Sequence, residues 1–94
     1  MLAKVLKEEG LLKSINGVNF VHKVLKKGEI IDKHNHPGKE IVFAVMKGAF
    51  DITIAESEKH KVVAGEVLNF DGVNTISAVA LEDSESLVVL VNKE

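Results

Sequence analysis

Hydrophobic and polar residues alternate along short segments of this chain, and polar turns separate the segments. The segment from Ala49 to Ala55 shows this most clearly. Phe50, Ile52 and Ile54 are apolar there, and the residues between them are polar. A period of two residues predicts a β-strand with one buried face. Further strands are expected at residues 11–15, 18–26, 60–64, 67–70, 75–81 and 87–91.

Residues 40–47 break the alternation, because Ile41 to Met46 are all apolar. Such a run fits either a short buried helix or a strand that is buried on both faces. The β-branched residues and the glycine that follows at position 48 favour the strand. A polar turn is expected at residues 82–85, before the last strand.

The amino-terminal residues differ from the rest. Residues 1–9 have apolar side chains at helical spacing but are few for a stable helix. Asn16-Gly17 is a strong hairpin signal. We therefore interpret residues 1–94 as a single all-β domain, in which residues 1–16 are an N-terminal arm and residues 17–94 form a barrel of closed or double-sheet architecture.

Composition narrows the function. The chain has 94 residues, no cysteine and a net charge of −2. All its basic residues are lysines, so neither a basic field nor a bidentate arginine favours nucleic acid. No apolar run approaches the roughly 20 residues that span a bilayer. The first residues lack the apolar core of a secretory signal, so a cytoplasmic protein without membrane or nucleic-acid partners is expected.

The most informative stretch holds His34 and His36, followed by Pro37-Gly38 and Glu40. Side chains two apart on a strand share a face, so the two imidazoles should point the same way. The turn at Pro37-Gly38 lets Glu40 swing back beside them. Two imidazoles and a carboxylate suit a divalent metal such as Zn, Ni, Mn or Fe. The alternative is a cluster of solvated loop residues.

This stretch resembles the first motif of the cupin superfamily, G-x5-H-x-H-x3-4-E-x6-G. Gly28, His34, His36 and Glu40 fit it as written. Seven residues then precede Gly48 instead of six, although the span from His36 to Gly48 equals that of the long form.

The second cupin motif, G-x5-P-x-G-x2-H-x3-N, is degenerate. It begins properly at Gly65, but Asp71, Val73 and Ile76 stand at the proline, second glycine and histidine positions. The resemblance covers roughly residues 18–92. It implies a small single-domain cupin of the cupin-2 kind, with a jelly-roll β-barrel, also called a double-stranded β-helix.

The resemblance also implies that His34, His36 and Glu40 are metal ligands. The fourth ligand of the family is missing, because Ile76 cannot bind a metal. Three outcomes follow: a metal with three protein ligands and water, a substitute histidine such as His22, or a cavity without metal.

Two functions are compatible with this site. The first is a cupin that binds a divalent metal at a 2-His-1-Glu site and acts, if it is an enzyme, on a small organic molecule. The alternative is a non-catalytic cupin that binds or senses a small ligand without a metal. Neither the substrate nor the reaction follows from the fold.

A homodimer is also expected. The apolar strand at residues 41–46 fills the barrel with one face and leaves the other to be covered. Cover by a second copy is predicted, with Ile41, Phe43 and Val45 supplying the contact. Cover by the N-terminal arm of the same chain is the alternative.

Overall fold

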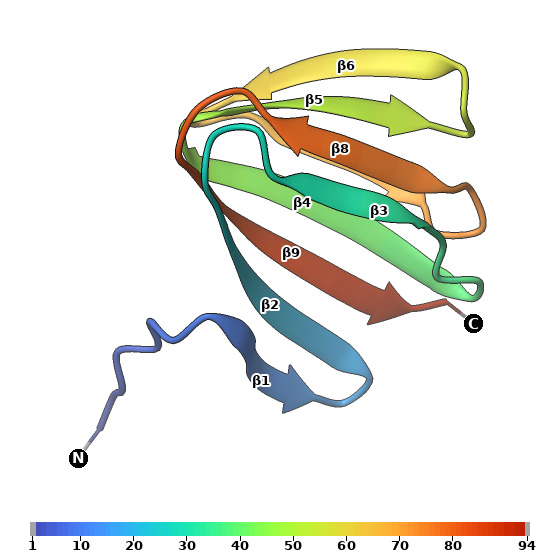
Figure 1. Ribbon diagram of the computed structural model, residues 1–94. Coiled ribbons are helices and arrows are strands. Elements are labelled where there is room, and N and C mark those ends of the chain that lie inside the picture. The colour runs from blue at the N-terminus through green and yellow to red at the C-terminus, as the bar shows by residue number, and fades with distance from the viewer. Residues whose placement is uncertain (1, 94) are drawn as a thin grey trace.

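The computed structural model describes residues 2–93; residue 1 of the predicted arm and residue 94 of the predicted barrel lie outside the described part. The described residues form nine strands in two antiparallel sheets. The larger sheet has the order β1-β2-β9-β4-β7 and the smaller one β3-β8-β5-β6, and the two face each other (Figure 1). The strands are β1 (Gly10–Ile15), β2 (Val18–Leu25), β3 (Ile30–His34), β4 (Lys39–Lys47), β5 (Ala49–Ile54), β6 (Glu58–Val63), β7 (Val67–Asp71), β8 (Ile76–Ala80) and β9 (Ser84–Asn92).

The all-β, double-sheet prediction is confirmed. The apolar run at residues 41–46 lies in strand β4, so the strand and not the helix is correct. Strand β5 buries Phe50, Ile52 and Ile54 as its alternation predicts. Among residues 2–93, no helix has the length and apolar character needed to cross a bilayer.

The predicted turn at residues 82–85 is wrong at its carboxyl end, because β9 begins at Ser84. The Ser84 hydroxyl is buried and accepts a hydrogen bond from the Ala49 backbone N–H at 3.0 Å. A serine with such a local backbone partner is tolerated inside a sheet, although serine is more common in turns. Because serine is polar, the sequence did not indicate that Ser84 and Ser86 are inward-facing positions of β9.

The Asn16-Gly17 hairpin is confirmed. Both residues have positive φ angles, 49° and 78°, as a type I′ turn requires. The turn pairs β1 with β2, so residues 10–15 of the predicted arm belong to the larger sheet. Residues 2–9 form no regular structure and extend away from the sheets (Figure 1).

The core lies between the sheets, where Phe43 of β4 meets Phe50 of β5 in an edge-to-face contact with ring centroids 5.3 Å apart. On β4, Ile41, Phe43 and Val45 are all buried in this core. The prediction that these three residues supply an intermolecular contact is therefore corrected. Since side chains alternate along a strand, the outward residues of β4 are Glu40, Val42, Ala44 and Met46.

Candidate functional site

The loop between β3 and β4, which carries His36, is hydrogen-bonded to the turn that contains Gly72. His34 ends β3, and His36 follows in the loop before β4. The His36 backbone N–H donates to the Gly72 carbonyl, and the Gly72 N–H donates to the Lys39 carbonyl, each at 2.7 Å. A Cβ at Gly72 would lie 2.4 Å from the His36 carbonyl oxygen, so only glycine allows this close approach.

The two imidazoles lie together, as their spacing predicts. Their ring centroids are 4.9 Å apart in an edge-to-face arrangement, and both line a cavity between the sheets. Nδ1 of His34 donates to the Asp32 carbonyl at 2.7 Å, because a carbonyl only accepts. Nε2 of a neutral His34 therefore keeps its lone pair.

The surroundings of His36 favour its neutral form. Burial lowers the pKa of its imidazole below 6.5, and the nearby His34, Lys39 and Lys23 lower the pKa further. Desolvation and neighbouring positive charge both disfavour the imidazolium. At neutral pH the ring therefore offers one donor and one acceptor to a bound molecule.

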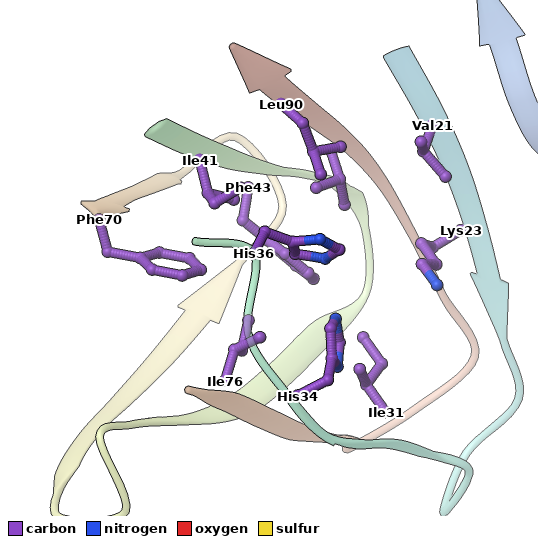
Figure 2. A pocket seen from close by; sticks show the side chains of 11 residues that line it. Val21, Lys23, Ile31, His34, His36, Ile41, Phe43, Phe70, Ile76 and Leu90 are labelled. Carbon is purple, nitrogen blue, oxygen red and sulfur yellow. The ribbon is translucent and has the colours of Figure 1, made fainter. Parts of the chain in front are cut away.

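The cavity has a volume of about 160 Å³ and is mainly apolar. Figure 2 shows its apolar side chains around the two imidazoles. It is lined from both sheets and the intervening loop by Val21, Lys23, Ile31, His34, His36, Ile41, Phe43, Phe70, Ile76, Val88 and Leu90.

The structure does not bring Glu40 to the histidine pair. Glu40 precedes the buried Ile41 on β4 and so faces the other side of the sheet. Its carboxylate accepts a hydrogen bond from Nδ2 of Asn69 at 2.9 Å. Within residues 2–93, no three histidine, cysteine, aspartate or glutamate side chains are grouped so that they could hold a metal.

Ile41 takes the inward place instead. It lines the cavity, and four residues separate it from His36, which is the long spacing of the first motif. Six residues then separate Ile41 from Gly48, as that motif is written. With the long spacing, the glutamate position of the motif therefore falls on the inward-facing residue of β4. In this chain that residue is Ile41.

Ile76 lies where the degenerate second motif implies it should. It pairs with His34 across β3 and β8, is 5% exposed and lines the cavity. Two positions at which the resemblance implies metal ligands therefore carry isoleucine.

His22 is also not brought to the pair, although it is buried. It lies on the outward side of β2, where Nε2 donates to Oε1 of Glu85 at 2.9 Å and Nδ1 to the Glu8 carbonyl at 3.1 Å. The hydrogen bond that His22 donates to Glu85 is the main cause that raises the pKa of His22. Both ring nitrogens are thus engaged away from the cavity. His60, on β6, contacts Glu58 and does not line the cavity either.

Lys23 also lines the cavity with the two histidines, although the sequence did not predict it as a site residue. Its neighbours His22 and Val24 face outward on β2, so alternation directs Lys23 inward beside Val21. A lysine at an inward position of a strand is the signal that could have identified it, since an uncompensated buried charge is costly.

Comparison with known proteins shows the fold. No protein-family profile and no curated protein sequence matches the chain. A protein of unknown function from Streptococcus pyogenes has a similar structure, with 26% sequence identity, a TM-score of 0.77, and coverage of 89% of this chain and 72% of that one.

Two further structures extend the match. An RmlC-like cupin family protein with a double-stranded β-helix fold, from Methanocaldococcus jannaschii, is 19% identical, has a TM-score of 0.79, and covers 99% of this chain and 93% of its own. An uncharacterised protein with a double-stranded β-helix domain, from Klebsiella pneumoniae, is 16% identical with a TM-score of 0.82, over 93% of this chain and 77% of that one. The chain is a small protein of the cupin fold.

The donor set does not fit a resident metal held by three or four protein ligands. Two imidazoles converge on the cavity, but the positions implied for the remaining ligands are the aliphatic side chains Ile41 and Ile76. Zinc, nickel, manganese and iron need nitrogen, oxygen or sulfur donors. The two imidazoles are thus the only nitrogen donors of the expected ligand set that the described residues bring to the cavity.

Proposed function

We propose that this protein binds a small organic molecule in the cavity between its sheets and does so without a resident metal. The observation that carries the proposal is the inward placement of Ile41 and Ile76 beside His34 and His36. Hydrophobic side chains there enclose a ligand, whereas the imidazoles orient its polar end. Apolar pockets with a few convergent polar groups are typical of small-molecule sites.

The cavity sets the size of the ligand. Its volume of about 160 Å³ is close to that of an engineered cavity of about 150 Å³ that binds benzene. A single six-membered ring or a short branched chain therefore fills the space. Burial of apolar surface supplies about 25 cal/mol per Å², so the expected affinity for so small a molecule is modest.

Benzyl alcohol, a neutral molecule of this size, tests the proposal. We expect its titration into the 15N-labelled protein to move the amide signals of residues that line the cavity. Ile76→Phe should abolish these shifts by filling the cavity. The control is Ile52→Val, which loosens the core at a residue that does not line it. No shift at the cavity up to the solubility limit of the probe would contradict the proposal.

A second candidate function is binding of a divalent metal by the histidine pair alone. The specific observation in its favour is the contact between the two rings, 4.9 Å apart, with the Nε2 lone pair of neutral His34 free. Water or an organic ligand would supply the remaining donors. Calorimetric titration with Ni²⁺ of the wild type and of His36→Ala distinguishes this function, because equal heats from the two proteins would exclude it.

A further inference from the structure

The ionisable side chains that line the cavity are all basic. Its lining includes one lysine and two histidines but no aspartate or glutamate. Figure 2 shows the nitrogens of Lys23, His34 and His36 in one part of the cavity. The remaining lining residues are aliphatic or phenylalanine. The cavity thus has an apolar part and a part that carries positive charge.

We infer that the cavity selects a small amphipathic monocarboxylate, with its ring or short chain in the apolar part and its carboxylate facing Lys23. This inference rests on the proposed function and adds the chemical class of the ligand. Lys23 is the residue that determines the specificity, and the one N–H of the neutral His36 ring supplies a further hydrogen bond to a carboxylate oxygen.

Lys23 lacks a counterion within the described residues. The lysine ion pairs among residues 2–93 are those of Lys33 with Glu56 and of Lys93 with Asp71. Lys23 is half-buried on the inward side of β2. A bound carboxylate would supply the missing counterion through a charge-assisted hydrogen bond to this ammonium.

Ser86, which lies beside Lys23, also favours a polar ligand group at this place. Ser86 is its cross-strand partner on β9 and is 0% exposed. Its hydroxyl has no hydrogen-bond partner among the described residues. Buried hydroxyls normally have partners, so unused polar capacity lies next to Lys23 in the interior of the barrel.

Other ligand classes fit less well. A cation would meet Lys23 with no carboxylate in the cavity lining to compensate it. A neutral molecule would fill the apolar part but leave the ammonium unpaired. The cavity volume of about 160 Å³ leaves no room for a polyanion such as a nucleotide.

The test compares benzoate, benzyl alcohol and benzylamine, which share one ring and differ in charge. We expect the wild type to bind benzoate most tightly and benzylamine most weakly. Lys23→Met should weaken benzoate binding about tenfold, as for loss of one charge-assisted hydrogen bond, and should leave benzyl alcohol binding unchanged. Lys61→Met, which removes an exposed lysine from β6 on the other sheet, is the matched control and should change neither.

The outcomes separate the two proposals. Binding of benzyl alcohol without preference for benzoate overturns the carboxylate inference alone. Absence of binding by all three probes overturns the proposed function as well. If Lys23→Met does not fold, the wild type still decides, because benzoate affinity must fall with added salt and benzyl alcohol affinity must not.

Discussion

At the scale of single residues, His22 shows how a histidine can be buried and yet take no part in the cavity. It is 9% exposed, and its two ring N–H groups reach Glu85 of β9 and the Glu8 carbonyl of the amino-terminal segment. A protonated ring satisfies both acceptors, and the carboxylate of Glu85 raises the pKa of His22. His22 therefore fastens residues near Glu8 to the larger sheet.

This arrangement predicts a pH-dependent stability. Because the pKa of folded His22 is raised above 6.5, its contribution is fully present below about pH 6.5 and is lost as pH rises through the folded value. Urea unfolding should show Glu85→Gln to be less stable than the wild type by up to about 1 kcal/mol at pH 6, since the pair is partly exposed.

At pH 9 the difference between the two proteins should shrink. Glu58→Gln is the matched control, because it removes a carboxylate that contacts the more exposed His60. A loss of stability in Glu85→Gln that is equal at pH 6 and pH 9 would show that the hydrogen bond matters and the charge does not.

At the scale of elements, the phase of strand β4 decides which side chains reach the cavity. The pairing of β4 with β9 places Ile41 opposite Leu90, and both line the cavity. Glu40 lies opposite Val91 on the other face. On the smaller sheet, the pairing of β3 with β8 sets Ile76 beside His34. Two isoleucines thus stand in register with the histidine pair.

This register predicts how a metal site could be built. The double variant Ile41→Glu, Ile76→His should bind Ni²⁺ at least about tenfold more tightly than the wild type, a gain of about 1.4 kcal/mol, because it adds two donors beside His34 and His36. Its metal-free form should be less stable, since a carboxylate and an imidazole replace buried aliphatic groups.

Glu40→Gln in the same double variant is the control. It should leave the calorimetric Ni²⁺ affinity unchanged, because Glu40 faces away from the cavity. Loss of nickel binding in that triple variant would restore Glu40 as a ligand and contradict the strand phase described above.

At the scale of the whole molecule, the larger sheet has an apolar outer face. Phe20 of β2, Val42 of β4 and Val89 of β9 lie side by side across it and are only half-buried. The chain exposes 6074 Å², whereas a compact monomer of 10.2 kDa exposes about 5300 Å². The excess is comparable to the roughly 800 Å² that each partner buries in a standard interface.

We therefore propose that two copies pair through this outer face, and that the amino-terminal segment contributes. Leu2 and Val5 in that segment are 107% and 86% exposed, so their burial against a partner would stabilise the dimer. Light scattering at micromolar concentration should give a mass near twice 10.2 kDa. Val42→Glu should shift the protein to folded monomers, because each copy would then place a carboxylate in the apolar interface.

Two further variants distinguish the outer face of the larger sheet from the smaller sheet and from the core. Val79→Glu places the same charge on the outer face of the smaller sheet and should remain dimeric. Phe43→Glu should unfold the protein, because that side chain is 2% exposed in the core. A wild-type mass near 10.2 kDa would contradict the dimer and leave the apolar face uncovered.

The sequence by itself determined the strands and most of their turns. Local signals suffice for these elements, because alternation along Phe50, Ile52 and Ile54 or a turn at Asn16-Gly17 is encoded within a few residues. The cupin resemblance and the proximity of His34 and His36 also follow from the sequence. The two histidines are only two residues apart, with no turn between them.

Only the tertiary structure decided which residues share the cavity with the histidines. The turn at Pro37-Gly38 interrupts the period of two, so the spacing from His36 does not fix whether Glu40 or Ile41 faces inward. The pairing of β4 with β7 and β9 fixes that phase, and a shift of one residue reverses every side chain. Lys23 was missed because its neighbours in the cavity come from β3, β4, β7, β8, β9 and the loop after β3. A local sequence pattern does not encode contacts between strands that are distant in sequence.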